Sequence, residues 1–271
     1  MRFLPFSCLL LGLAWPFSFS SAADETKVPL PAKKDFHLFI LAGQSNMAGR
    51  GKVDDEGRKI YPRIYSLGKD GAWQPAVDPL HWDKPAAGVG VGKPFAQIIA
   101  AKNPAVTVGL VPTACGGSPI RTWQPGEYWE QTKSHPYDDF LSRAKRAMQD
   151  GTLKGILWHQ GEGDSNPADA PLYEKKLTEL IERMRHDLDA PDLPLIIGQI
   201  GRFPAKPWDA SREAVDAAQQ AVAKKVKNVR FVTAEGFTSI GDNLHFDSPS
   251  LRIFAQRYAE AWLQLDSAAG R

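Results

Sequence analysis

Short apolar runs alternate with amphipathic stretches along most of this chain. Five of the runs have the length and residue content of buried β-strands. They cover residues 36–42, 106–111, 153–158, 195–200 and 229–232. A weaker run at residues 64–67 predicts a short additional strand.

Between the predicted strands, apolar residues recur at steps of three and four, which is the pattern of an amphipathic helix. These stripes predict helices over residues 95–101, 140–148, 173–188, 215–226 and 251–262. Ser248 followed by Pro249 is a favourable N-cap and first-turn pair for the last helix.

Continuously apolar strands that alternate with amphipathic helices predict a mostly parallel sheet covered by helices on both faces. A closed barrel requires eight strand–helix units, whereas about five are found here. The pattern therefore predicts an open, doubly wound α/β sheet of five strands. Such sheets bind ligands at the carboxyl ends of their strands.

The first 23 residues have the composition of a cleavable signal peptide. Arg2 precedes an apolar run at residues 3–19, and the small residues of 20–23 follow it. A membrane anchor is the alternative, but the run is short and two prolines interrupt it. A lipoprotein signal is disfavoured because Cys8 lies too early. We therefore expect cleavage near Ala23, a secreted or periplasmic protein, and a linker over residues 24–35.

Overall composition narrows the class of protein further. The chain has 271 residues, of which 43% are hydrophobic and 24% charged, as in ordinary globular proteins. Its formal charge of +2 and the lack of a basic stripe argue against a nucleic-acid partner. No later segment is apolar enough to predict a membrane span, so no membrane partner is expected after cleavage. Cleavage would leave Cys115 as the only cysteine, which excludes an internal disulfide.

Small and polar residues gather where four of the predicted strands lead into loops. These segments are 43–47, 112–118, 159–164 and 241–245. Because the carboxyl ends of parallel strands share one edge of a sheet, the four segments should converge on one crevice.

The residues of this crevice permit nucleophilic acyl transfer. A base must remove the proton of a serine hydroxyl, and His245 can serve Ser45 in this way. Asp242, three residues before His245, can orient its imidazole ring. The tetrahedral intermediate also needs hydrogen-bond donors for its oxyanion. The candidate donors are the backbone N–H of Ser45, that of Gly116 or Gly117, and the side-chain amide of Gln160.

Each of these residues also has a purely structural explanation. Ser45 alone would more often be a helix cap, a pair of glycines is usually a turn, and Cys115 is more often a small buried residue than a nucleophile. A metal site is a further alternative. It would use His159, Glu162 and Asp164, but this ligand set is poorly defined. Only the combination of the four segments favours catalysis.

Four sequence blocks resemble the SGNH (GDSL-like) hydrolases, and more narrowly their carbohydrate esterase family 6 and sialate O-acetylesterase branch. The blocks are residues 40–51, 114–123, 158–164 and 242–246. Together they span roughly residues 36–265. The order Ser, Asp, His also fits α/β-hydrolases, but their nucleophile turn has a glycine where this chain has Met47.

The resemblance implies a flavodoxin-like three-layer α/β/α sandwich over residues 36–267 and no cofactor or metal. It implies Ser45 as nucleophile, His245 as base and Asp242 as the acid that orients it. The implied oxyanion donors are Ser45, one of the two glycines, and Gln160, which stands where the wider superfamily has asparagine. Further residues of the blocks are expected to contact substrate or support the catalytic groups. They are Gln44, Asn46, Arg121, Trp123, His159, Glu162 and Asp164.

The usual substrates of this branch are acetylated sugars, either xylan or sialoglycans. Several tryptophans in predicted loops offer indole faces that could support sugar rings, although some should cover the edges of the core. They are Trp73, Trp82, Trp123, Trp129 and Trp208. An esterase acting on other short acyl esters and an inactive carbohydrate-binding protein are the alternatives.

Overall fold

The computed structural model describes residues 29–268 and 270. The expected signal peptide and residues 24–28 of the expected linker lie outside this part of the chain. The described linker residues include a single 3₁₀ turn at Lys33–Asp35. No helix among the described residues is long and apolar enough to cross a bilayer.

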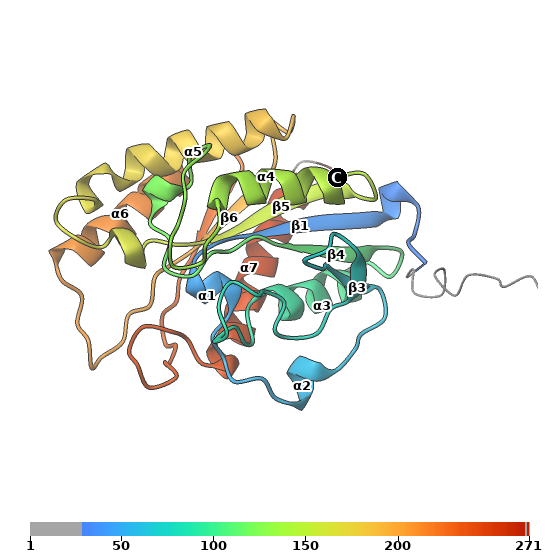
Figure 1. Cartoon of the computed structure of the whole chain (residues 1–271), viewed down its shortest axis with the longest axis horizontal. Coiled ribbons are helices and arrows are strands. Elements are labelled where there is room, and N and C mark those ends of the chain that lie inside the picture. Colours follow the sequence, from blue (N-terminus) through green and yellow to red (C-terminus); the bar gives the residue numbers. More distant parts are fainter. Residues whose placement is uncertain (1–28, 269, 271) are drawn as a thin grey trace, which may run out of the picture.

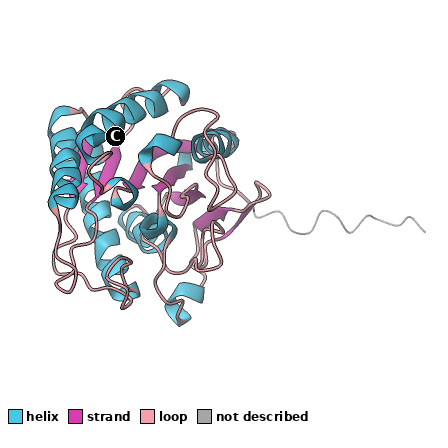
Figure 2. Ribbon diagram, turned by 60° about the vertical axis from the view of Figure 1, so that its left-hand side comes forward, coloured by secondary structure: helices cyan, strands magenta, loops and turns pink. Residues whose placement is uncertain are grey.

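A seven-stranded sheet forms the centre of the fold (Figures 1 and 2). Its strands are β1 Phe36–Gly43, β2 Ile64–Leu67, β3 Trp73–Pro75, β4 Thr107–Pro112, β5 Thr152–His159, β6 Leu195–Gly198 and β7 Val229–Val232. Their spatial order is β3-β2-β4-β1-β5-β6-β7, and only the β2–β3 pair is antiparallel. The predicted mostly parallel sheet is confirmed.

The predicted number of five strands is two too few, because β2 and β3 extend the sheet beyond β4. The 64–67 run does form strand β2, and β3 adds three more residues beside it. A strand as short as β3 contains too few residues to show an alternating pattern, so the sequence carries no clear signal for it.

Helices cover both faces of the sheet, as the sequence predicted. On one face lie α3 Gly92–Lys102 and α7 Ser248–Ala268; on the other lie α4 Pro136–Ala147, α5 Tyr173–Asp187 and α6 Ala210–Lys225 (Figure 1). Two single-turn helices, α1 Ser45–Ala48 and α2 Asp55–Arg58, were not predicted because one turn shows no periodicity.

Strand β1 shows why its sequence is continuously apolar. Phe39 and Leu41 face the α3 and α7 side, whereas Leu38 and Ile40 face the α4, α5 and α6 side. All four are fully buried. A strand that is covered on both faces buries every side chain, so its apolar run is uninterrupted.

Hydrogen bonds at the start of α7 differ from the prediction. Asp247 Oδ1 accepts from the backbone N–H of Ser250 at 2.9 Å, so Asp247 provides the cap. Ser248 instead donates from its hydroxyl to the carbonyl oxygen of Lys52 at 2.7 Å. This bond attaches α7 to the loop that follows the nucleophile segment.

Strand β1 lies at the point where the chain reverses its direction across the sheet. β4 pairs with one side of β1 and β5 with the other, and further strands extend outward from both. In open α/β sheets the ligand crevice lies at the carboxyl end of this position. Helix α1 lies at the carboxyl end of β1 (Figure 1). Ser45 is its first residue, so the fold places this side chain at the position of the crevice.

Away from the crevice, the carboxyl group of Asp78 is buried in the neighbourhood of Lys93 and Arg252. Asp78 is 6% exposed, and within residues 29–268 its Oδ1 has no hydrogen-bond partner. Burial raises its pKa to about 7, although Lys93 and Arg252 favour the charged form. Because the folded-state pKa exceeds the unfolded-state value, this group stabilises the fold below about pH 4. That stability is lost as the pH rises through 7.

Asp78→Asn is therefore expected to raise the melting temperature by several degrees at pH 8 and to give no such gain at pH 4. Thermal unfolding followed by circular dichroism at the two pH values tests this. Asp55→Asn is the control, because Asp55 is fully exposed. An equal change at both pH values would show that ionisation of Asp78 is not the cause.

Candidate active site

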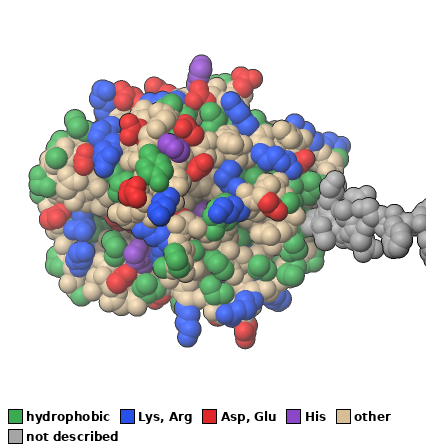
Figure 3. All heavy atoms as spheres, viewed as in Figure 1, with side chains coloured by type: hydrophobic (Ala, Val, Ile, Leu, Met, Phe, Trp, Pro, Cys, Tyr) green, Lys and Arg blue, Asp and Glu red, His purple; other side chains and the backbone are tan. Residues whose placement is uncertain are grey.

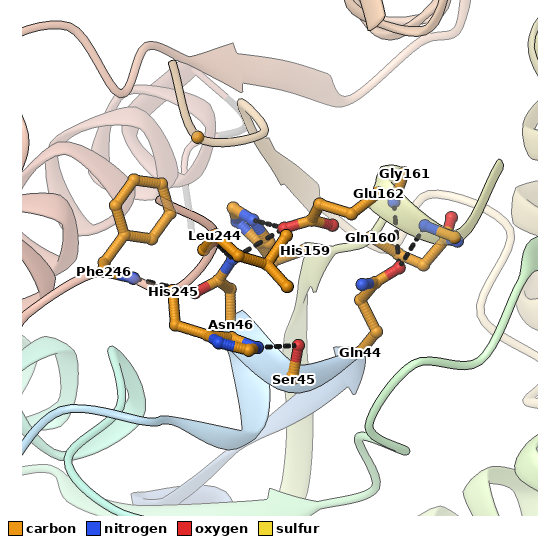
Figure 4. Close-up of polar contacts among 12 residues, drawn as sticks. Gln44, Ser45, Asn46, His159, Gln160, Gly161, Glu162, Leu244, His245 and Phe246 are labelled. Atoms are coloured by element: carbon orange, nitrogen blue, oxygen red, sulfur yellow. Dashed lines mark hydrogen bonds and ion pairs between the residues drawn. The ribbon is translucent and has the colours of Figure 1, made fainter. Parts of the chain in front are cut away.

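Ser45, His245 and Asp242 form a continuous hydrogen-bonded chain. Ser45 Oγ lies 2.9 Å from His245 Nε2 (Figure 4), and His245 Nδ1 lies 2.6 Å from Asp242 Oδ2. Ser45 follows β1, whereas the other two residues lie on the loop between β7 and α7. The fold thus brings together residues that are 200 positions apart in the sequence. In this arrangement His245 can remove the serine proton while Asp242 orients the ring.

The carboxylate of Asp242 also shapes the loop that carries His245. Asp242 Oδ1 accepts from the backbone N–H groups of Leu244 and His245, both at 2.9 Å. Asn243, which lies between Asp242 and Leu244, adopts a left-handed conformation with φ of 52°. Burial opposes ionisation of Asp242, but these hydrogen bonds and the one from the His245 ring outweigh it, so its pKa is lowered. Asp242 is therefore charged beside the imidazole at neutral pH.

Asn46 holds the backbone on both sides of His245. Its Oδ1 accepts from the N–H of Phe246 at 3.1 Å, and its Nδ2 donates to the carbonyl oxygen of Leu244, also at 3.1 Å (Figure 4). The residue after the nucleophile therefore fixes the position of the base.

A buried acid completes this support. Asn46 Nδ2 also donates to Glu162 Oε1 at 2.6 Å, and the same oxygen lies 3.4 Å from His159 Nε2. Burial opposes ionisation of Glu162, but its bonds with His159 and Asn46 lower its pKa overall. His159 and Asn46 are almost completely buried, so they support the site from beneath.

Replacing Asn46 by alanine is expected to lower kcat for an aryl acetate by about 10- to 100-fold and to change KM little. The reason is that small displacements of a catalytic group can cost about two orders of magnitude. Steady-state kinetics measures this, with melting temperature as a check of folding. Asn103→Ala, in the loop after α3, is the control. A fully active Asn46→Ala enzyme would show that the base keeps its position without this side chain.

The structure distinguishes the two glycines that were considered as oxyanion donors. The N–H of Gly116 donates to Asp83 Oδ2 at 2.9 Å and is therefore occupied. Within the described chain, the N–H groups of Gly117 and Ser45 have no acceptor. Gly117 also lines the same cavity as Ser45. The expectation for Gly116 is corrected, and Gly117 is the glycine available to an oxyanion.

The expectation that Gln160 contributes its amide is also wrong in this structure. Gln160 is completely buried, and its Nε2 donates to the carbonyl oxygen of Ser118 at 3.2 Å and to Asp164 Oδ2 at 2.5 Å. Its Oε1 accepts from the hydroxyl of Tyr173 at 2.8 Å. Gln160 and Asp164 therefore connect the glycine loop to the end of β5 rather than facing Ser45.

Gln44 presents the amide that Gln160 does not. Its Oε1 accepts from the N–H groups of Gly161 and Gly163 at 3.4 and 3.2 Å, which sets the orientation of the amide. Its Nε2 has no acceptor among the described residues, and Figure 4 shows this nitrogen on the side facing Ser45 and His245. The sequence named Gln44 only as a contact or support residue. Both glutamines follow a strand end and both are buried, so only the partners of their amide nitrogens distinguish them.

The cavity in front of Ser45 has a volume of about 610 Å³. Its lining includes Gln44, Ser45, Gly117, Glu162, Gly163, Asp242 and His245, together with the apolar residues Ala86, Ile240 and Leu244. The catalytic chain and the three unoccupied donors therefore face one space.

Two residues expected near the substrate lie elsewhere. Trp123 is fully buried in the core, and its Nε1 donates to Ser118 Oγ at 3.0 Å. Arg121 is exposed and lies over the ring of Trp129, 6.0 Å from its centroid, without lining the Ser45 cavity. Trp73 is also buried, in β3 rather than in a loop.

The alternatives to a serine nucleophile receive no support from the site. Cys115 is 5% exposed, and burial raises the pKa of its thiol to about 12, so it is protonated at neutral pH. In the described part of the chain, no group of three or more His, Cys, Asp or Glu side chains has the arrangement of a metal site.

Residues 35–264 match the family model described as carbohydrate esterase, sialic acid-specific acetylesterase. The chain belongs to this family. It is accordingly a carboxylic ester hydrolase. A protein of Arabidopsis thaliana named as a probable carbohydrate esterase is 34% identical to this chain over 263 residues. The alignment covers 88% of this chain and 94% of that relative.

Solved structures give the same fold for this carbohydrate esterase. A structure from Arabidopsis thaliana superposes with a TM-score of 0.76 at 32% identity, covering 86% of this chain and 99% of the other. NanS gives 0.68 at 20% identity over 87% and 98% of the chains. A carbohydrate acetylesterase from Xanthomonas citri gives 0.67 at 19% identity over 86% and 57%. The last two, at this level of identity, show the fold alone, which is that of the SGNH hydrolases.

Proposed function

We propose that this esterase removes acetyl groups from carbohydrate hydroxyls through an acetyl-enzyme at Ser45. The observation that carries the proposal is the chain from Ser45 through His245 to Asp242, which faces a cavity with three unoccupied donors. A binding protein has no need for this combination.

In the first half of the reaction, Ser45 Oγ attacks the acetyl carbonyl carbon while His245 Nε2 takes the hydroxyl proton. The oxyanion that forms accepts hydrogen bonds from the N–H groups of Ser45 and Gly117 and from Gln44 Nε2. Collapse of this intermediate breaks the bond to the sugar oxygen. His245 then gives its proton to that oxygen, and the sugar leaves with a free hydroxyl.

In the second half, water attacks the acetyl-Ser45 carbonyl while His245 removes a proton from the water. The same three donors stabilise the second intermediate. Acetate leaves, and His245 returns the proton to Ser45. Asp242 stays ionised throughout and stabilises the imidazolium, in line with its lowered pKa.

Acetylated xylan and O-acetylated sialoglycans are the substrates that we propose. The family description names a sialic acid-specific acetylesterase, and the Xanthomonas citri neighbour is named a carbohydrate acetylesterase. We further propose that the first 23 residues direct export and are removed, which would place the enzyme where such polymers occur.

Acetate release from acetylated xylan, O-acetylated sialic acid and an aryl acetate tests this function, with an aryl butyrate as the longer acyl comparison. We expect release from an acetylated sugar, and the preferred sugar identifies the natural class. Preference for the butyrate would indicate a general short-chain esterase. Sugar binding without release from any ester would indicate a protein that binds but does not catalyse.

A further inference from the structure

A second cavity, of about 430 Å³, lies beside the Ser45 cavity. The loop after β4, the first turns of α4 and two neighbouring loops enclose it. Its lining includes Lys69, His81, Trp82, Asp83, Thr113, Cys115, Thr132, Lys133, Ser134, Asp139, Ser142 and Arg143. None of these residues has a role in the reaction proposed for Ser45.

Only a thin wall separates the two cavities. Asp83 lines the second cavity, and the next residue, Lys84, lines the Ser45 cavity. Thr132 and Gln131 are divided in the same way. Hydrogen bonds hold this wall together, because Asp83 accepts from Gly116 N–H and Lys84 Nζ donates to Gln131 Oε1 at 2.7 Å. Two pairs of consecutive residues therefore line both cavities, so the cavities lie side by side.

A polymeric substrate bound at Ser45 can extend as far as the second cavity. An acetylated residue held at Ser45 must place the adjoining part of its glycan against the surface around the site. The second cavity is therefore within reach of a neighbouring sugar or side group of the same molecule.

The charges of the second cavity are unbalanced. Arg143 donates to three backbone carbonyl oxygens, those of Pro112, Gly68 and Leu67, rather than to a carboxylate. Burial lowers its pKa to about 10, so it remains charged at neutral pH. Lys69 and Lys133 also have no carboxylate partner within the described chain.

The acids of this cavity compensate for little of that charge. Asp83 already pairs with Arg50 at 2.7 Å, and Asp139 is the remaining lining carboxylate. Asp139 and Asp70, which follows Lys69, both act on Arg143, so three cations face two acids, and the remaining positive charge favours an anionic ligand group.

The uncharged lining has groups that suit a sugar. Trp82 is 41% exposed, although the guanidinium of Arg143 lies 4.4 Å from its ring centroid. The hydroxyls of Thr132, Ser134 and other lining residues can bond to sugar hydroxyls. His81, 5% exposed, contributes to the lining, but its Nε2 atom is buried away from the cavity surface.

We infer that the second cavity is a subsite for a sugar carboxylate carried by the same glycan as the acetyl group at Ser45. The sugar carboxylate faces Lys69, Lys133 and Arg143, and Trp82 contacts the ring. This inference rests on the proposed function. The carboxylate belongs either to a uronic acid side group of a xylan or to sialic acid itself.

Calorimetric titration of the full chain tests this without any turnover. Two pairs of ligands are compared. In the first pair, a xylo-oligosaccharide with one glucuronic acid side group is compared with the same oligosaccharide without it. In the second pair, methyl sialoside is compared with a neutral methyl hexoside. We expect one acidic ligand to bind about five- to tenfold more tightly than its neutral counterpart, and this advantage to shrink with added salt. The preferred acid identifies the source of the carboxylate.

The double variant Lys69→Gln/Lys133→Gln should lose this advantage. The matched control Lys102→Gln/Lys145→Gln removes the same charge from two exposed lysines outside the cavity and should keep it. Melting temperatures confirm folding. Equal binding of acidic and neutral ligands, or an advantage that survives in the first double variant, would overturn the subsite. Acid-selective binding by a protein that hydrolyses no ester would instead overturn the proposed function alone.

Discussion

Replacing Ser45 by alanine is expected to lower kcat for an acetyl ester by about 10⁴- to 10⁶-fold, because the variant lacks the atom that forms the acetyl-enzyme. Substrate binding should change little, since the cavity walls and the oxyanion donors remain. Acetate release at saturating substrate, together with a melting curve, measures the effect.

Cys115→Ala is the matched control for this variant. Cys115 directly precedes Gly116 and Gly117, so its thiol is the other side chain of this loop that could act as a nucleophile. Its buried, protonated thiol gives no reason for a loss of activity. We expect this variant to retain most of its kcat. A Ser45→Ala enzyme with more than a tenth of the original rate would contradict the proposed chemistry.

The second large effect is expected at Gln44. Gln44→Glu keeps an oxygen that accepts from Gly161 and Gly163, but it replaces the donor Nε2 by a carboxylate oxygen. We expect kcat to fall by at least about 10²- to 10³-fold, the usual effect of losing one oxyanion donor. KM should change much less, because the carbonyl oxygen of the bound ester accepts a weaker hydrogen bond from Gln44 Nε2 than the oxyanion does. Parallel kinetics of Gln44→Glu and Gln44→Ala would show the loss in kcat.

Gln160→Ala provides the contrast to Gln44. It removes a buried amide bonded to Ser118 and Asp164, so it should lower the free energy of unfolding by about 1–3 kcal/mol. The folded fraction should keep kcat within tenfold. The reverse result, with Gln160 essential and Gln44 dispensable, would restore the assignment made from the sequence.

The sequence predicted the layers of this fold because strands such as β1 are buried on both faces and read as continuous apolar runs. It also predicted that Ser45 and His245 would meet, since both follow strands whose carboxyl ends share one edge. These inferences need only periodicity and the rule for the position of ligand crevices.

The finer assignments depend on atoms that a linear pattern does not contain. Asp83 occupies the N–H of Gly116, and nothing in the residues around Gly116 indicates a partner 33 positions away. Gln160 is buried because Tyr173 and Asp164 fill its hydrogen bonds, and both come from other elements. Trp123 was expected near the substrate because it falls in a predicted loop, but it packs into the core against Trp158.

A trapped acetyl group on Ser45 tests the central claim most directly. The enzyme is mixed with an excess of aryl acetate, quenched in acid within the first turnovers, digested and mapped by mass spectrometry. We predict that the peptide containing Ser45 gains the mass of one acetyl group, and that Ser45→Ala shows no such gain. An acetyl group that forms during turnover on another residue, or Ser45→Ala that still turns over the ester at a comparable rate, would contradict a Ser45 acetyl-enzyme.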